Sequence, residues 1–364
     1  MQPYEIIDNV IEDVLADNLN ENYCLLSFPD HIRFDHTLTN RGNFLVDKSQ
    51  RNNQNVYHRG EWLESRYIDE STAKLYKQYV LNHRYVVDNN VVQHSFEPVY
   101  YNYDKDLWDY VLHIESNHTV LHSEYNSNDI KKLENLGVNC VHWFAHAYLC
   151  SEFYFKHYKK LSMVTDYLSR PIKYPWISAN RLLRDYRIDF LHRIDFTKGA
   201  YSLLETDPWG NKLWGIVPPN SFDHHGNDSA EINVRDLTPW NTSFLHIVNE
   251  TVWQDKIHFT EKVFKPIVMH QPFVVLQAPG SLEYLRSYGF KTFGDWWDES
   301  YDTIQDPEER MIAIAEIVDW IPDQDLYKLR NEMSGVLEHN FRHFYENIPD
   351  ICLDELGAAI QATP

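Results

Sequence analysis

The stretch FLHIVNETVWQDKIHFTEKVFKPIVMHQPFVVLQAPG, residues 244–280, decides the fold that the sequence predicts. Its two apolar runs, 244–248 and 273–276, have the length of buried strands, and the segment 261–270 between them is helix-like. Thr260 is the expected N-cap of this helix, because a threonine hydroxyl can accept a hydrogen bond from a free amide of the first turn. Two apolar strands joined by a helix predict a βαβ unit, and hence an α/β fold.

Polar and charged residues of this stretch fall where α/β folds bind their ligands. Asn249 and Glu250 follow the first apolar run, and Glu261 and Lys262 open the predicted helix. Ligands bind beyond the carboxyl ends of parallel strands, and the free amides of a helix start attract anions. A carboxylate can accept both hydroxyls of a ribose and an ammonium can neutralise a phosphate. The pattern therefore suits a nucleotide; the alternative is an ordinary helix start with a surface lysine.

Three arginines form a second candidate for phosphate binding. Arg181, Arg184 and Arg187 are spaced three residues apart after a predicted strand that ends at Asn180. This spacing places them on adjacent turns of one helix start. Guanidinium groups suit bidentate binding of phosphate. The alternative is a solvated basic face that pairs with nearby acidic residues.

The first half of the chain carries another strand–helix–strand pattern, with predicted strands ending near His122 and His146. Glu124 follows the first of these strands and opens a loop, so it is the best candidate for a general base that deprotonates an acceptor hydroxyl. His146 is the second catalytic candidate, although a single histidine at a strand end is more often a hydrogen-bonded structural residue.

Composition sets the broad class of the protein. The chain has 364 residues, 43% of them hydrophobic, which is enough for two domains. A net charge of −21 disfavours binding to nucleic acid or to an anionic membrane. The sequence has no apolar run of membrane-spanning length, no CxxC pair and no signal-peptide pattern at its start. We therefore expect a cytoplasmic protein with no metal site and no membrane partner.

The motifs above resemble the donor-binding region of the fucosyltransferase-like glycosyltransferases. Phe259-Thr260-Glu261-Lys262 stands where that family has Tyr-x-Thr-Glu-Lys, and Asn249-Glu250 stands in its Glu-Asn-Ser element with the two residues in reverse order. The segments 271–275 and 180–187 are similar to its second apolar strand and to the arginine element of related transferases. HSE at 122–124 is similar to glycosyltransferase-like proteins of tailed phages, and the resemblance covers about 119–320.

This resemblance implies a GT-B-like architecture, in which two Rossmann-like domains face a central cleft. Residues 1–168 would form the acceptor-side N-terminal α/β domain, 169–340 the nucleotide-sugar-binding domain, and 341–364 a C-terminal tail that packs back toward the N-terminal domain. Glu261 would bind the ribose, Lys262 the diphosphate, and Glu124 would be the general base. The implied set of donor-binding residues is Arg181, Arg184, Arg187, Asn249, Glu250, Thr260, Glu261 and Lys262.

The expected function is the transfer of a sugar from a nucleotide-sugar donor to a glycan or other hydroxyl acceptor. We expect an inverting, metal-independent reaction without a cofactor, because cations and helix amides can stabilise the leaving diphosphate in such folds. One alternative is a phage DNA-modifying transferase that acts on a hydroxymethylated base; the acidic charge disfavours DNA, and the local lysines that favour it are Lys131, Lys132, Lys156, Lys159 and Lys160. The sequence also leaves open a metal-dependent transferase that uses Asp104 and Asp106, and a non-catalytic protein that binds a sugar nucleotide or a glycan.

Overall fold

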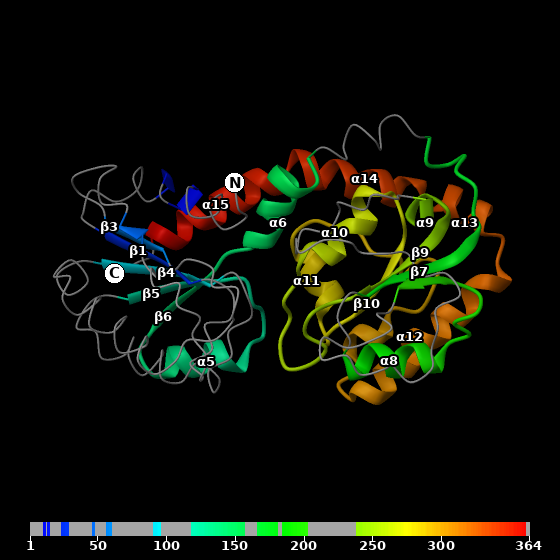
Figure 1. The fold of residues 1–364 in the computed structure, drawn as a ribbon, viewed down its shortest axis with the longest axis horizontal. Coiled ribbons are helices and arrows are strands. Elements are labelled where there is room, and N and C mark those ends of the chain that lie inside the picture. The colour runs from blue at the N-terminus through cyan, green and yellow to red at the C-terminus, as the bar shows by residue number, and fades with distance from the viewer. Residues whose placement is uncertain are drawn as a thin grey trace. The chain divides into compact units, whose positions relative to one another are not determined.

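The computed structural model describes residues 10–11, 13–14, 23–28, 46–47, 56–59, 90–95, 118–156, 166–180, 184–202 and 238–361. The chain forms two compact units, each with its own sheet of mainly or entirely parallel strands. Unit 1 comprises Met1–Leu149 together with Asp350–Pro364, and unit 2 comprises Cys150–Pro349. Figure 1 shows the sheet of each unit with helices beside it.

The sheet of unit 1 has the strand order β2-β3-β1-β4-β5-β6. All neighbouring strands are parallel except β2 and β3, which are antiparallel. The strands are β1 (Tyr23–Phe28), β2 (Val46–Asp47), β3 (Val56–Arg59), β4 (Asn90–Ser95), β5 (His118–His122) and β6 (Asn139–His142). Because β3 and β4 lie on opposite sides of β1, the order is that of a doubly wound α/β sheet.

The ends of the helices of unit 1 coincide with local signals in the sequence. Helix α5 (Asn128–Asn135) starts after Ser127, whose hydroxyl accepts from the third following amide as an N-cap. It ends at Asn135, two residues before Gly137, whose φ of +91° few other residues adopt. Helix α6 (Ala145–Leu149) follows β6 after a short turn. The last helix is α15 (Ile348–Gln361). It contacts the segment after β6, where Nε1 of Trp143 donates to the carbonyl of Cys352 on α15 at 2.8 Å.

The sheet of unit 2 has four parallel strands in the order β10-β9-β7-β8. They are β7 (Tyr174–Ala179), β8 (Ala200–Ser202), β9 (Ser243–Asn249) and β10 (Phe273–Leu276). Every residue of β9 is buried, as the continuous apolar run predicts for a central parallel strand. The chain winds from β7 to β8 on one side and then crosses to β9 on the other. The point where the strand order reverses therefore lies between β7 and β9.

Helices cover both faces of the sheet of unit 2. Figure 1 shows α8 and α12 on one face and α9, α10 and α14 on the other. Thr260 is the N-cap of α10, as predicted, and accepts from the amide of Lys262. The helical segments are η1 (Cys150–Tyr154), α8 (Asp185–Arg193), α9 (Thr238–Asn241), α10 (Glu261–Val268), α11 (Ser281–Ser287), η2 (Ser300–Thr303), α12 (Pro307–Trp320), η3 (Ile321–Asp323), α13 (Leu326–Glu332) and α14 (Ser334–Glu346). The α/β class with parallel sheets is confirmed, and it is compatible with a Rossmann-like fold.

The compact units differ from the predicted ranges 1–168, 169–340 and 341–364. Tyr345 donates to the carbonyl of Phe155 at 2.6 Å, and the ring of Tyr167 stacks on His270 at 4.3 Å. These contacts place the segment before β7 in unit 2, so the proline-containing turn at 169–171 leads into a strand and does not separate the units. In the described part of the chain, no helix is long and apolar enough to cross a membrane.

Candidate functional site

The carboxyl ends of β7 and β9 form the first candidate site. Asn180 and Asn249 each donate a side-chain amide proton to the hydroxyl oxygen of Ser178, at 3.0 and 2.9 Å. All three side chains are buried. The bond from Asn249 joins β9 to β7 at the point where the strand order reverses, which is the position where open α/β sheets bind their ligands.

Glu250 follows β9 and is fully buried. Its Oε1 accepts from the amide of Thr260 at 3.2 Å, and its Oε2 accepts from the Thr260 hydroxyl at 2.6 Å. Burial raises the pKa of Glu250, while the nearby ammonium of Lys262 acts in the opposite direction. A buried carboxylate in this position holds the start of α10 against the end of β9. Its predicted contact with a donor stays a prediction.

Lys262 and Glu261 form a partly exposed ion pair in the first turn of α10. Lys262 Nζ lies 3.1 Å from Glu261 Oε1, and the two side chains are 23% and 15% exposed. Nζ also donates to the hydroxyls of Thr260 at 2.8 Å and Thr251 at 3.3 Å. An ammonium and a carboxylate at a helix start, both open to solvent in part, can meet an anion and a hydroxyl of the same ligand.

Electrostatics keep both members of this pair charged. Burial acts to lower the pKa of Lys262, but the carboxylates of Glu261 and Glu250 outweigh it and raise the pKa above its ordinary value. Burial acts to raise the pKa of Glu261, but the charges of Lys262 and Lys265 outweigh it and lower the pKa. The site thus presents a stable positive charge with an acidic hydrogen-bond acceptor beside it.

The predicted arginine element is divided by the structure. Arg187, on α8, is buried, and its Nη2 donates to the carbonyls of Asn249 at 2.9 Å and Glu250 at 3.0 Å. It therefore braces the turn after β9 from the neighbouring strand–helix unit. Arg184 precedes α8 and is half-buried. Arg181 lies outside the described residues. A phosphate-binding role for the three arginines stays a prediction.

An aromatic stack beside Arg187 was not foreseen from the sequence. The rings of Tyr186 and Trp253 are parallel, with centroids 5.7 Å apart, and the Tyr186 hydroxyl donates to the carbonyl of Glu250. The guanidinium of Arg310 covers the ring of Trp253 at 4.3 Å, and it donates to the carbonyls of Ile304, Gln305 and Trp253. Burial lowers the pKa of Arg310 to about 10. The stack ties α12 to the turn that carries Glu250.

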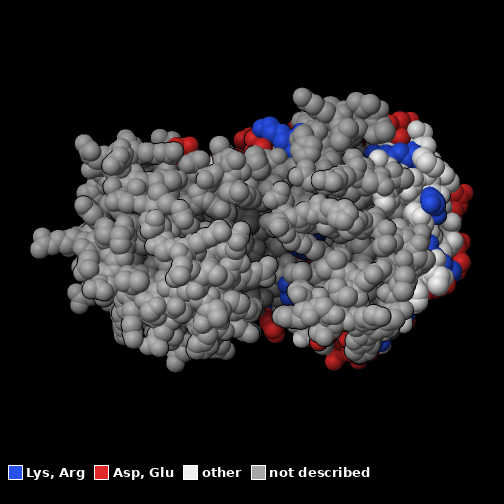
Figure 2. All heavy atoms as spheres, viewed as in Figure 1, with Lys and Arg blue, Asp and Glu red and all other residues white. Residues whose placement is uncertain are grey.

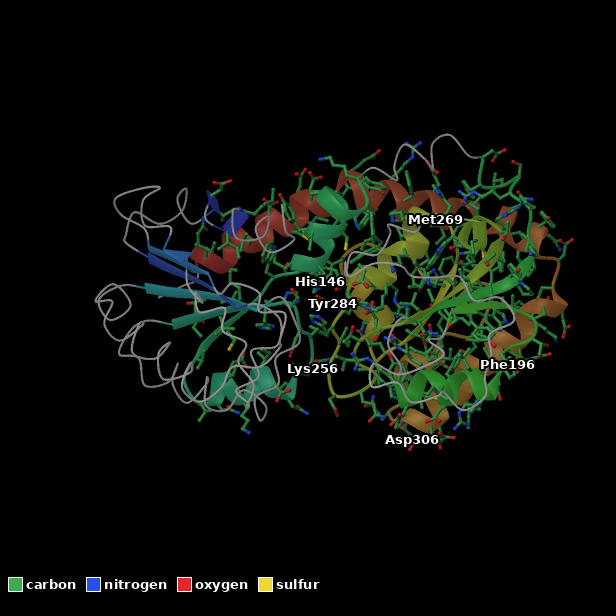
Figure 3. All side chains as sticks on the ribbon, in the orientation of Figure 1. His146, Phe196, Lys256, Met269, Tyr284 and Asp306 are labelled. Atoms are coloured by element: carbon green, nitrogen blue, oxygen red, sulfur yellow. The ribbon has the colours of Figure 1, made fainter. Side chains whose placement is uncertain are left out.

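In unit 1, the predicted catalytic residues lie near the carboxyl ends of β5 and β6. Glu124 and His146 are only 2% and 3% exposed, and His146 lies on α6 (Figure 3). The amide of Glu124 donates to Nδ1 of His122 at 3.3 Å. The Ser123 hydroxyl donates to the carbonyl of Trp143 at 2.7 Å and so joins the two strand ends. The catalytic roles of Glu124 and His146 stay predictions.

A carboxylate from the last helix completes this edge of unit 1. Oε1 of Glu355, on α15, lies 2.9 Å from Nδ1 of His142, the last residue of β6. Its Oε2 accepts from the amide of Phe144 at 2.8 Å. The two residues are more than 200 positions apart in the sequence, and no local motif marks the pair. His142 was not identified from the sequence, because the predicted strand ends near His146, four residues later.

Comparison with protein-family models gives no match, and comparison with curated proteins gives none either. Among the described residues, no group of three or more His, Cys, Asp or Glu side chains could hold a metal ion. Asp104 and Asp106 lie outside those residues.

The structure therefore brings together Asn249, Glu250, Thr260, Glu261, Lys262 and Arg187 at one edge of unit 2, and places Glu124 and His146 in unit 1. The lysines suggested for DNA are divided between the units: Lys131 and Lys132 lie on α5, and Lys156 lies in unit 2, where it pairs with Glu152 at 2.6 Å. On the face drawn in Figure 2, the described acidic and basic side chains are interspersed.

Proposed function

We propose that the protein is a glycosyltransferase that moves a sugar from a nucleotide-sugar donor to a hydroxyl acceptor. The observation that carries this proposal is the charged pair Glu261–Lys262, which lies at the start of α10 beside the β7–β9 reversal point. A nucleoside diphosphate offers the two groups that this pair can bind, a phosphate and a ribose diol. The GT-B-like arrangement and the acceptor-side role of unit 1 are parts of the same proposal.

In this proposal, Lys262 and the amides of the first turn of α10 bind the diphosphate, and Glu261 accepts from the ribose hydroxyls. As the bond to the sugar breaks, negative charge develops on the leaving diphosphate. A fixed ammonium and fixed amides stabilise that charge without reorganisation. Arg187 and Glu250 contribute by holding the turn after β9 and the N-cap of α10 in place.

Binding of nucleotides tests the donor site first. We expect a nucleoside diphosphate or nucleotide sugar, chosen from a panel with each common base, to raise the unfolding temperature of the full chain. At 100 times its dissociation constant, such a ligand stabilises the fold by about 2.7 kcal/mol. Lys262→Ala should weaken binding roughly 10- to 100-fold, because it removes a charge-assisted contact.

Lys328→Ala is the matched control, since Lys328 is an exposed lysine on α13 of the same unit. It should leave the affinity unchanged. Stabilisation by no member of the panel would count against the transferase, and an unchanged affinity in Lys262→Ala would refute the assigned site. Mass spectrometry of acceptor mixtures incubated with the bound nucleotide sugar would then identify the transferred sugar.

A second candidate is a non-catalytic protein that binds a sugar nucleotide. The burial of Glu124 and His146 favours it, because a general base must reach the acceptor hydroxyl. The same experiments separate the two candidates. A non-catalytic binding protein would bind the nucleotide through Lys262 but would transfer no sugar to any acceptor. A DNA-modifying transferase would instead transfer the sugar only to DNA with hydroxymethylated bases.

A further inference from the structure

We propose that His142 accepts the proton of the acceptor hydroxyl and that Glu355, on the last helix, positions it for this step. The inference rests on the proposed transferase function and replaces Glu124 and His146 in the role of general base. It is carried by one contact, the 2.9 Å hydrogen bond between His142 Nδ1 and Glu355 Oε1 at the carboxyl edge of the sheet of unit 1.

Glu355 is fixed at both of its oxygens. Oε1 meets the imidazole, and Oε2 accepts from the amide of Phe144 at 2.8 Å, just before α6 begins. One turn earlier on α15, the carbonyl of Cys352 accepts from Trp143 Nε1 at 2.8 Å. Three consecutive residues at the end of β6 therefore bind the same helix, and this gives the carboxylate a defined position.

The hydrogen bond determines which nitrogen of His142 is basic. A carboxylate only accepts hydrogen bonds, so the proton between the two groups belongs to Nδ1. In the neutral imidazole the lone pair is then on Nε2, the nitrogen that can receive a proton from a substrate. The carboxylate also stabilises the imidazolium that forms after proton transfer, as in the carboxylate–histidine pairs of other enzymes.

Exposure distinguishes His142 from its neighbours. Its side chain is 24% exposed and that of Glu355 is 26% exposed, whereas Glu124 and His146 are almost completely buried. His122, on the adjacent strand, is also buried, and its Nδ1 accepts from the amide of Glu124. The titratable groups that contact the His142 ring from other elements include His122, with ring centroids 5.7 Å apart, and Glu355.

The proposed step balances without a further reactant. The acceptor hydroxyl gives its proton to Nε2 of His142, and its oxygen forms a bond to the anomeric carbon of the donor sugar. The bond between that carbon and the diphosphate oxygen breaks, and the electron pair leaves with the nucleoside diphosphate. The imidazolium then returns its proton to solvent.

Glu355→Gln tests the assignment with little change in shape. The glutamine oxygen can still accept from the amide of Phe144, but its amide group donates to Nδ1 of His142. This places the imidazole proton on Nε2, where it blocks proton uptake. We expect kcat to fall roughly 10²- to 10⁴-fold, the contribution of a general base, with the donor KM and the unfolding temperature unchanged. His142→Gln should reduce kcat to a similar extent.

Glu134→Gln is the matched control, because Glu134 is an exposed carboxylate on α5 of the same unit. It should leave kcat unchanged. Nitrogen-15 spectra of the imidazole groups give a readout that needs no turnover: they should show the Nδ1–H form of His142 in the wild-type chain and the Nε2–H form in Glu355→Gln.

An Nε2–H form in the wild-type chain would overturn the inference. Full activity of Glu355→Gln would also overturn it, while leaving the proposed function intact. Failure of the wild-type chain to transfer sugar from any nucleotide sugar would overturn the proposed function and the proton transfer together. Loss of kcat in Glu355→Gln with the predicted change of tautomer would support both.

Discussion

Replacing Thr260 by valine removes the hydroxyl that links the buried acid of the candidate site to its ammonium. The hydroxyl donates to Glu250 Oε2 at 2.6 Å, so its lone pairs accept from Lys262 Nζ at 2.8 Å and from the Lys262 amide at 3.5 Å. The bond to the carboxylate contributes about 1.5–3 kcal/mol, and the N-cap about 1 kcal/mol. We expect Thr260→Val to lower the free energy of unfolding by roughly 2.5–4 kcal/mol.

Urea denaturation at constant pH measures this change, and Thr260→Ser is the control. Serine keeps the hydroxyl and should retain most of the stability. The sign of the pH dependence is also defined. Burial raises the pKa of Glu250, and the hydrogen bonds from Thr260 counteract that rise. The lost bonds matter most when Glu250 is ionised, so the difference between Thr260→Val and the wild-type chain should grow from acidic to neutral pH.

A Thr260→Val variant as stable as the serine variant would refute the proposed link. A difference that is constant with pH would show that the N-cap alone, and not the carboxylate, depends on this hydroxyl. Nucleotide affinity should decrease in Thr260→Val even at temperatures where the variant is fully folded. The reason is that the ammonium of Lys262 loses one of the hydrogen-bond acceptors that hold it in place.

Three further perturbations test the packing of unit 2. Burial lowers the pKa of His270 to about 4, so the unfolded chain takes up a proton at a higher pH than the folded chain does. The free energy of unfolding should therefore fall by about 3 kcal/mol as the pH drops from 6.5 to 4. His270→Asn should make the free energy of unfolding, measured by urea denaturation, less dependent on pH in this range. Gly289→Ala should cost about 1–3 kcal/mol, because φ is +88° and a Cβ would lie 2.8 Å from an imidazole, whereas Gly335→Ala, with open space around it, should be neutral or stabilising in thermal melts. Arg187→Gln should lower the unfolding temperature without any ligand, whereas Arg193→Gln, which breaks a more exposed ion pair, should change it little; an unchanged melt for Arg187→Gln would contradict its bracing role.

The βαβ stretch was predictable because its signals are local. Apolar runs marked β9 and β10 closely, and Thr260 marked the first turn of α10. Each signal depends on neighbours in sequence, which the side-chain pattern records directly. A similar local signal is present at α12, where Asp306 (Figure 3) accepts from two amides of the first turn and a proline follows it. Local patterns thus predicted the α/β class and the ends of several elements.

Roles that depend on distant contacts were not predictable. Arg187 belongs to a sequence motif that suggests phosphate binding. In the structure, its guanidinium instead donates hydrogen bonds to the carbonyls of Asn249 and Glu250, at the end of another strand. Glu250 is a polar residue after a strand in the sequence, and only the contact with Thr260 shows why it can be fully buried. The segment 290–293 has a strand-like composition, yet it is not a strand of either described sheet.

Nothing in the sequence identified Glu355 as a partner of His142. Its contact spans 213 positions, and nothing in the surrounding helix distinguishes this acid from its acidic neighbours. Pairings of this kind become visible only when the tertiary fold is known.

The composition of unit 1 from two separate segments has a consequence for synthesis. The ribosome releases the strands of unit 1 first, but the helix that carries Cys352 and Glu355 emerges only after all of Cys150–Pro349. At roughly 5–20 residues per second, this delay lasts on the order of tens of seconds. Unit 2 has its whole sequence synthesised before unit 1 does. Unit 2 can therefore complete its folding first. The sheet of unit 1 can pack against α15 only after that helix has been synthesised.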